Sequence, residues 1–244
     1  MTSPCRSHKQ RVIAAQSGAA DPVMDSKAAT QYELMLMQLA EHRRRLKQIQ
    51  SIERKIEVKR QLLPEYESYV QGVLLSNSGR QDDVLMTVLV WYIDTGAIDK
   101  ALDVAEYALN HDLQTPDRYE RSSACLIAEE IADTALKLMD GENAVPAELI
   151  GKAIALTEEH DMFDQVRARL LKAYGMALTK SGNQSAAVEP LKRALELDER
   201  SGVKKLIEQT ERDIKKNSSQ PVVEQPEQPE QPEQPEQPEQ PEQP

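Results

Sequence analysis

The sequence predicts an all-α protein whose last residues form a tail without a core. Aromatic residues make up only 4% of the chain, and no stretch alternates apolar and polar residues over a length typical of a β-strand. Apolar residues instead recur at intervals of three and four up to about residue 216. The chain then ends in seven consecutive Glu-Gln-Pro triplets, residues 224–244, in which proline at every third position forbids a helix. We therefore expect residues 217–244 to be disordered.

Residues 1–28 show no clear period and are predicted to form a flexible basic arm. Arg6, Lys9 and Arg11 give the start of this arm a positive bias. The start of the sequence lacks the apolar stretch of a signal peptide, and no run approaches the roughly 18 apolar residues that a membrane span needs. Cys5 and Cys125 are too few for a disulfide framework or a thiolate metal site. We therefore expect a cytoplasmic protein with no membrane partner.

A long helix is predicted from about residue 30 to residue 63. Its apolar residues follow one another mostly at steps of three and four, as in a bundle or a coiled coil. This seam consists of Tyr32, Met35, Leu39, Leu46, Ile49, Ile52, Ile56 and Leu63. Pro64 can end this helix and open the next, because proline is tolerated in a first helical turn. Residues 29–80 thus form one region, whose seam could join copies of the chain.

Residues 81–216 are predicted to form an irregular stack of helical hairpins. After a turn at Gly96, small and aliphatic residues lie on one stripe of a helix, so the partner helix must come close. The stripe consists of Ala101, Leu102, Ala105, Ala108 and Leu109. The same arrangement returns after Gly182, and Gly175 lies on the inner face of the preceding helix.

These two units resemble tetratricopeptide repeats, although Leu89 replaces the motif glycine in the first and Glu199 the motif proline in the second. A degenerate helix pair at 121–159 would fill the interval between them. A plain helical domain with a chance similarity to the repeat is the alternative.

Charge is distributed unevenly along the chain. Seven of the carboxylates behind the net charge of −11 belong to the tail, whereas residues 42–60 carry a net charge of +6. Such a density of cations is typical of a surface that neutralises phosphates, with an ordinary solvated helix face as the alternative. The candidate DNA contacts are Arg6, Lys9, Arg11, Arg43, Arg44, Arg45, Lys47, Arg54 and Lys55. The tail carboxylates would repel phosphate, which favours a solubilising spacer.

No set of residues in the sequence indicates catalysis. A phosphate-binding Walker loop is missing, and the four histidines do not fall at metal-ligand spacings. A cluster of acidic residues could suggest a divalent-metal nuclease: Asp82, Asp83, Asp94, Asp99 and Asp103. However, Asp83 and Asp99 stand at predicted helix starts, where a carboxylate accepts bonds from free backbone N–H groups. We therefore expect capping, and assign no catalytic residue, metal or cofactor to this chain.

Five segments resemble the GpM-type small terminase subunits of temperate tailed bacteriophages, a family also labelled terminase endonuclease subunit. They are MTSP at the start, LLPEYESYVQGVL (62–74), DDVLMTVLVWYIDTGAIDKALDVAEYAL (82–109), DQVRARLLK (164–172) and GVKKLIEQTER (202–212). The resemblance spans nearly all of residues 1–215. It implies a homo-oligomeric partner of a large ATPase subunit, which it joins to the cohesive-end site of phage double-stranded DNA. The DNA is then cut and packaged into procapsids in the cytoplasm of the bacterial host.

In terminases generally the nuclease resides in the large subunit, so this resemblance places Mg²⁺ and ATP on the large subunit alone. The family label assigns an endonuclease to the present subunit, yet no residues in its sequence stand out as carrying one. Two other classes compete with this interpretation. One is a tetratricopeptide-like adaptor between proteins without nucleic-acid contact, and the other is a metal nuclease in its own right.

Overall fold

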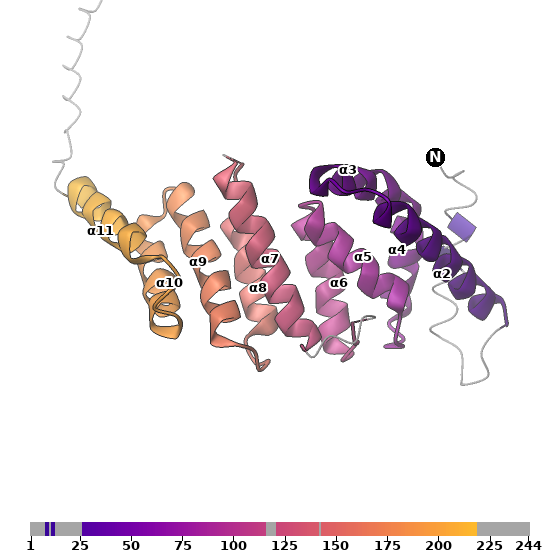
Figure 1. Cartoon of the computed structure of the whole chain (residues 1–244). Coiled ribbons are helices and arrows are strands. Elements are labelled where there is room, and N and C mark those ends of the chain that lie inside the picture. The colour runs from indigo at the N-terminus through magenta and orange to yellow at the C-terminus, as the bar shows by residue number, and fades with distance from the viewer. Residues whose placement is uncertain (1–7, 10, 13–25, 116–120, 142, 219–244) are drawn as a thin grey trace, which may run out of the picture.

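The computed structural model describes residues 8–9, 11–12, 26–115, 121–141 and 143–218. Within these residues the structure is helical and contains no strand, which confirms the predicted fold class. Most of the predicted arm at 1–28 and the tail beyond Ser218 lie outside the described residues. The helices stand side by side in a row, with α2 at one end and α11 at the other (Figure 1).

The single long helix predicted for residues 30–63 is wrong, because the structure divides it into α2 (Ser26–Lys47) and α3 (Ile52–Leu62). The backbone N–H of Gln48 donates to the Arg45 carbonyl at 3.3 Å, which tightens the last turn of α2. Ser51 then caps α3, since its hydroxyl accepts the Arg54 N–H at 3.2 Å. A 3₁₀ turn η1 (Leu63–Glu65) and α4 (Glu67–Ser76) follow.

The apolar seam of α2 packs inside the chain itself. Met35, Leu39 and Leu46 are buried, and α2 packs against α5 (Asp83–Asp94). Ile52 departs from this pattern, since 68% of it is exposed at the start of α3. If copies of the chain associate, they must therefore do so through a surface other than this seam.

The rest of the described chain forms consecutive helical hairpins. They pair α5 with α6 (Ile98–Asn110), α7 (Ser123–Asp140) with α8 (Ala147–Thr157), and α9 (Asp164–Lys180) with α10 (Gln184–Leu197). α11 (Lys204–Ser218) closes the stack against α10. α5 contacts α7 and α7 contacts α9, whereas α6 contacts α8, so the hairpins lie in two layers (Figure 1). The pair suggested for 121–159 is thus a real hairpin.

The turns at Gly96 and Gly182 have the same geometry, which explains the similarity of the two sequence units. Both glycines have positive φ, +80° and +84°, a region that residues with a Cβ atom rarely adopt. In both turns the next residue donates its N–H to a carbonyl five positions back: Ala97 to Tyr92 and Asn183 to Leu178, each at 2.9 Å. These bonds end one helix and aim the next one back along it.

The small residue at Gly175 permits a close approach of α9 and α10. A Cβ atom at this position would lie 2.5 Å from Cγ of Leu191, which is itself fully buried. Gly151 in α8 offers a contrast, since a Cβ there would meet Tyr174 at an ordinary contact distance of 3.4 Å. The last hairpin therefore depends on glycine for packing.

We predict that Gly175→Ala lowers the free energy of unfolding by about 1–3 kcal/mol through overpacking, although alanine favours a helix over glycine. Gly151→Ala is the matched control and should leave stability unchanged or raise it by up to about 1 kcal/mol. Urea denaturation followed by circular dichroism measures both. A Gly175→Ala protein as stable as the control would contradict the close approach of α9 and α10.

Candidate nucleic-acid interface

Polar bonds as well as apolar packing fix α2 on the rest of the fold. The ring of Tyr66 is fully buried, with its hydroxyl 2.8 Å from Nδ1 of His42 and its edge against Trp91 at a centroid distance of 5.8 Å. One residue further along α2, Arg43 donates to the Thr87 hydroxyl at 2.9 Å. Gln38 donates to Glu65 at 2.7 Å. α2 is therefore held in one orientation, which decides where its cations point.

The end of α2 and the start of α3 present a group of exposed cations. We call this surface the basic corner, and it consists of Arg44, Arg45, Lys47 and Arg54. Arg44 pairs with Glu41 at 2.9 Å and Arg54 with Glu57 at 2.6 Å, but these side chains are more than half exposed. Such surface pairs are worth little and can give way to phosphate. Among the described residues, neither Arg45 nor Lys47 forms an ion pair.

The basic corner is compact because a short connection joins its two helices. Residues 48–51 lie between α2 and α3, so the helix ends can be at most about 18 Å apart. Arg44, Arg45 and Lys47 also occupy the last turn of α2, where the helix dipole favours positive charge. A phosphate backbone passing this corner would meet cations from both helices.

Other cations of the basic segment serve the fold. Lys59 forms a largely buried ion pair with Asp94 at the end of α5, and Arg60 donates to the Thr95 carbonyl at 3.2 Å. Arg43 is half-buried and engaged with Thr87, and Lys55 is half-buried as well. Of the predicted arm contacts, Lys9 and Arg11 are exposed, whereas Arg6 lies outside the described residues. All nine residues remain predictions as DNA contacts. Of the six on α2 and α3, the four of the basic corner are exposed, whereas Arg43 and Lys55 are half-buried.

Asp82 and Asp83 are both candidates for the start of α5, and the structure places the cap at Asp82. Asp82 is 6% exposed and caps α5, accepting the Leu85 N–H at 2.8 Å and the Tyr69 hydroxyl at 2.5 Å. Burial raises the pKa of the Asp82 carboxyl, while the bonds from Tyr69 and the backbone oppose this shift. The expectation for Asp99 is wrong, since Ala97 occupies the cap position of α6 without a side-chain bond.

Two further acidic residues of the predicted cluster, Asp94 and Asp103, form ion pairs with cations on different helices. Asp94 pairs with Lys59, and Asp103 pairs with Lys152 of α8 at 3.4 Å. Over the described ranges, no group of three or more His, Cys, Asp or Glu side chains is arranged to hold a metal ion. The observed role of Asp82 is therefore structural.

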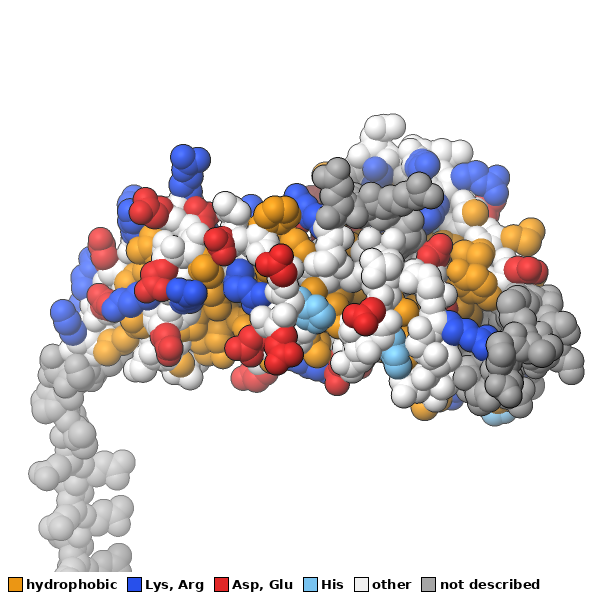
Figure 2. All heavy atoms as spheres, turned by 90° about the horizontal axis from the view of Figure 1, so that it is seen from below, with side chains coloured by type: hydrophobic (Ala, Val, Ile, Leu, Met, Phe, Trp, Pro, Cys, Tyr) orange, Lys and Arg blue, Asp and Glu red, His pale blue; other side chains and the backbone are white. Residues whose placement is uncertain are grey.

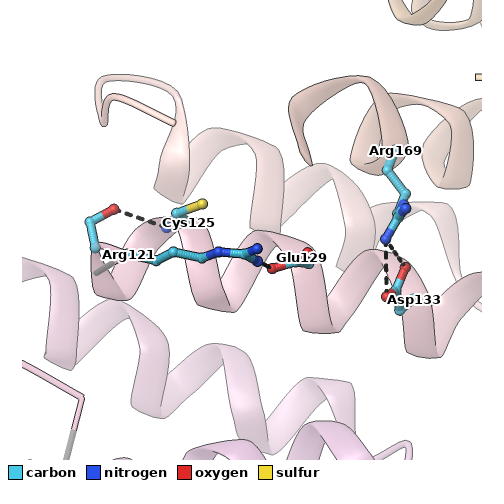
Figure 3. Close-up of polar contacts among 6 residues, drawn as sticks. Arg121, Cys125, Glu129, Asp133 and Arg169 are labelled. Carbon is cyan, nitrogen blue, oxygen red and sulfur yellow. Dashed lines mark hydrogen bonds and ion pairs between the residues drawn. The ribbon is translucent and has the colours of Figure 1, made fainter. Parts of the chain in front are cut away.

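A second polar surface lies on α7, between α5 and α9. Arg121 pairs with Glu129, and one nitrogen of Arg169 contacts both oxygens of Asp133 at 2.9 and 3.2 Å, which links α9 to α7 (Figure 3). Burial, followed by the neighbouring carboxylates of Asp94, Asp133 and Glu129, raises the pKa of the Glu130 carboxyl. Lys59 of α3 acts in the opposite direction and lowers the pKa of Glu130. This surface is acidic and lies on the hairpin stack.

The end of the stack formed by α10 and α11 carries charges of both signs. Acidic and basic side chains alternate over this end on the face drawn in Figure 2. Along α11, Lys205, Glu208, Arg212 and Asp213 are neighbours on the surface. No helix within the described part of the chain is long and apolar enough to cross a membrane.

Comparisons with known proteins assign most of the chain to one family. A family model described as phage small terminase subunit matches residues 36–165, more than half of the chain. The chain is 41% identical over 215 residues to the terminase, endonuclease subunit of Escherichia phage P2, and the alignment covers 88% of this chain and 87% of that protein. A model of the ribonuclease HII N-terminal domain matches only residues 181–220, largely α10 and α11. No solved structure matches.

We predict that Asp82→Ala lowers the free energy of unfolding by about 2–4 kcal/mol, because the change removes a helix cap and leaves the Tyr69 hydroxyl buried without its partner. Asp83→Ala is the matched control, since Asp83 is half-exposed and its side chain accepts a bond only from Gln81 among the described residues. It should cost less than about 1 kcal/mol. Chemical denaturation of both variants measures the difference, and equal losses would contradict the structural role of Asp82.

We also predict an acid sensitivity that originates at His42. Burial lowers the pKa of His42 below its ordinary value of 6.5, Arg45 lowers it further, and Glu65 and Glu41 oppose the shift. The unfolded chain therefore binds the proton first, so stability should fall as the pH drops from about 6.5 toward the folded-state pKa. Thermal melting at pH 7.5 and 5.5 should show a larger loss for the wild type than for His42→Gln. An identical loss in both proteins would exclude this origin.

Proposed function

Since the chain belongs to the phage small terminase subunit family, we propose that it joins a large ATPase subunit to phage double-stranded DNA at the cohesive-end site. In this proposal the basic corner contacts the DNA backbone, and the hairpin stack offers a protein surface to the large subunit. The assembled enzyme then cuts the DNA and packages it into procapsids in the cytoplasm of the bacterial host. The exposed cations of the basic corner are the observation that carries the proposal.

The basic corner has the properties of a phosphate-binding surface. His42 and Arg43 fix α2 on the core, and Lys59 and Arg60 fix α3, so the cations of the corner need little reorganisation to meet a DNA backbone. Arginine and lysine at such a surface bind phosphate but do not by themselves read bases. We therefore assign affinity and positioning to the corner, and the choice of the cohesive-end site to the assembled terminase with the arm residues Arg6, Lys9 and Arg11.

We assign nuclease and ATPase chemistry, with Mg²⁺ and ATP, to the large subunit. Support comes from the acidic residues that were the best nuclease candidates of this chain. Asp82 is committed to a helix cap, and Asp94 to an ion pair with Lys59. Each would have to leave a structural partner before it could coordinate a cation, which costs stability.

The hairpin stack favours a protein partner as the second half of the same function. Stacked helix pairs present extended surfaces that other proteins bind. The acidic surface on α7 and the mixed charges of α11 are two such surfaces. An adaptor that binds only protein is the alternative, and DNA binding separates the two.

We predict that the triple change of Arg44, Arg45 and Lys47 to Ala weakens DNA binding about 10- to 100-fold at low salt. The slope of log affinity against log salt should fall by about 2–3, because each lost phosphate contact removes about 0.9. Arg43 is left in place, since its bond to Thr87 supports the fold. Filter binding to cohesive-end DNA at two salt concentrations measures both quantities.

The matched control replaces Arg200, Lys204 and Lys205, three exposed cations near the start of α11, by Ala. It changes the net charge equally and should leave the affinity within about twofold. Unchanged binding by the first triple variant would remove the corner from the interface. A wild-type chain that captures the large subunit yet binds no DNA would favour the adaptor.

A further inference from the structure

The C-terminal repeat carries the opposite charge of the basic corner. Residues 224–244 hold seven glutamates and no cation, each glutamate followed by Gln and Pro. The polyproline II conformation, which such a proline repeat favours, has three residues per turn. A three-residue repeat in this conformation would place all seven carboxylates along one edge, about 9 Å apart. The sequence therefore encodes a regular polyanion.

The tail is long enough to reach the basic corner of its own chain. The described chain ends with α11 at one end of the row, and the basic corner lies where α2 meets α3, along the upper edge of the other half of the row (Figure 1). Packed helices lie about 8–10 Å apart, so the five contacts along α2–α5–α7–α9–α10–α11 span roughly 40–50 Å between the axes of α2 and α11. The 26 residues after Ser218 would span about 80 Å at 3.1 Å per residue.

The basic corner can receive such a segment. Arg45 and Lys47 have no ion-pair partner among the described residues, and the partners of Arg44 and Arg54 are exposed glutamates that another carboxylate can replace. The cations of α10 and α11, which lie nearer to the tail, are mixed with carboxylates (Figure 2). Residues 198–218 carry six cations, among them Arg200, Lys204 and Lys205, against five carboxylates, so this stretch has a net charge of only +1. Charge complementarity therefore selects the corner as the docking surface.

We propose that the Glu-Gln-Pro tail occupies the basic corner of its own chain and competes there with DNA. This inference rests on the proposed function, because it concerns the regulation of the same surface. A tethered segment reaches an effective concentration on the order of 1 mM, so even a weak contact is substantially populated. DNA carries one charge per about 1.7 Å of helix axis and displaces the sparser tail. The tail thus weakens nonspecific binding of the corner to DNA or other polyanions. It weakens binding less when the protein is part of a terminase complex that holds the DNA through additional contacts.

Two tail variants test the competition. One chain ends at Ser218, and the other keeps its full length but has Gln in place of the seven tail glutamates. Both should bind DNA about 3- to 10-fold more tightly than the wild type at roughly 50 mM salt, and the gain should vanish at about 0.5 M, where charges are screened. Wild-type affinity in both variants at low salt would overturn the proposal.

The same truncation in the Arg44, Arg45 and Lys47 triple-Ala background separates docking from simple repulsion. If the tail acts by covering the corner, its removal should give little or no gain once the corner has lost its cations. An equal gain in both backgrounds would mean that the tail only repels DNA, and would overturn the docking.

A measurement without DNA makes the inference independent of the proposed function. A spin label on a cysteine added after Pro244, in a chain carrying Cys5→Ser, should broaden the amide signals of residues 44–54 at low salt. Signals of α10 serve as the internal control, and high salt should reverse the effect. Broadening without any DNA affinity would refute the proposed function alone, whereas DNA affinity without broadening would refute the tail contact alone.

Discussion

The orientation of α2 is the constraint on which the candidate interface depends. Tyr66 connects α2 with the hairpin stack, because its buried ring lies between His42 of α2 and Trp91 of α5. The Arg43–Thr87 bond adds a second fixed point on the next residue of α2. Together they set the helix rotation, which turns Arg44, Arg45 and Lys47 outward. A small rotation of α2 about its axis would exchange structural and exposed cations.

The periodicity of the sequence predicts the helical class and most hairpins because both follow from local rules. Gly96 and Gly182 mark their turns through backbone freedom that other residues lack, and the small residues after them require close helices. The break between α2 and α3 escapes periodicity, since the apolar spacing continues through Ile49 and Ile52. It is the polar capping by Ser51 that ends the pattern, leaving Ile52 exposed. A serine within an apparently continuous helix was the available signal.

The basic segment is visible in the sequence as a density of charge, but the role of each cation is not. Thr87 engages Arg43 from 44 positions away, and Asp94 engages Lys59 from 35. Pairing between adjacent helices decides such roles, and no local pattern contains it. Asp82 shows the same principle for acids. Both Asp82 and Asp83 can start α5 by local rules, and only the Tyr69 hydroxyl, which arrives from α4, distinguishes the buried cap from its neighbour.

Local charge, rather than net charge, governs how this acidic chain can hold a polyanion. At physiological ionic strength, exposed charges farther apart than about 8–10 Å are largely screened from one another. The carboxylates of α11 lie at the opposite end of the row from α2, so they hardly weaken the field at the basic corner (Figure 1). The seven tail carboxylates contribute most to the chain's acidity but can influence the corner only by approaching it. For that reason the reach of the tail, more than its charge, decides whether it affects DNA.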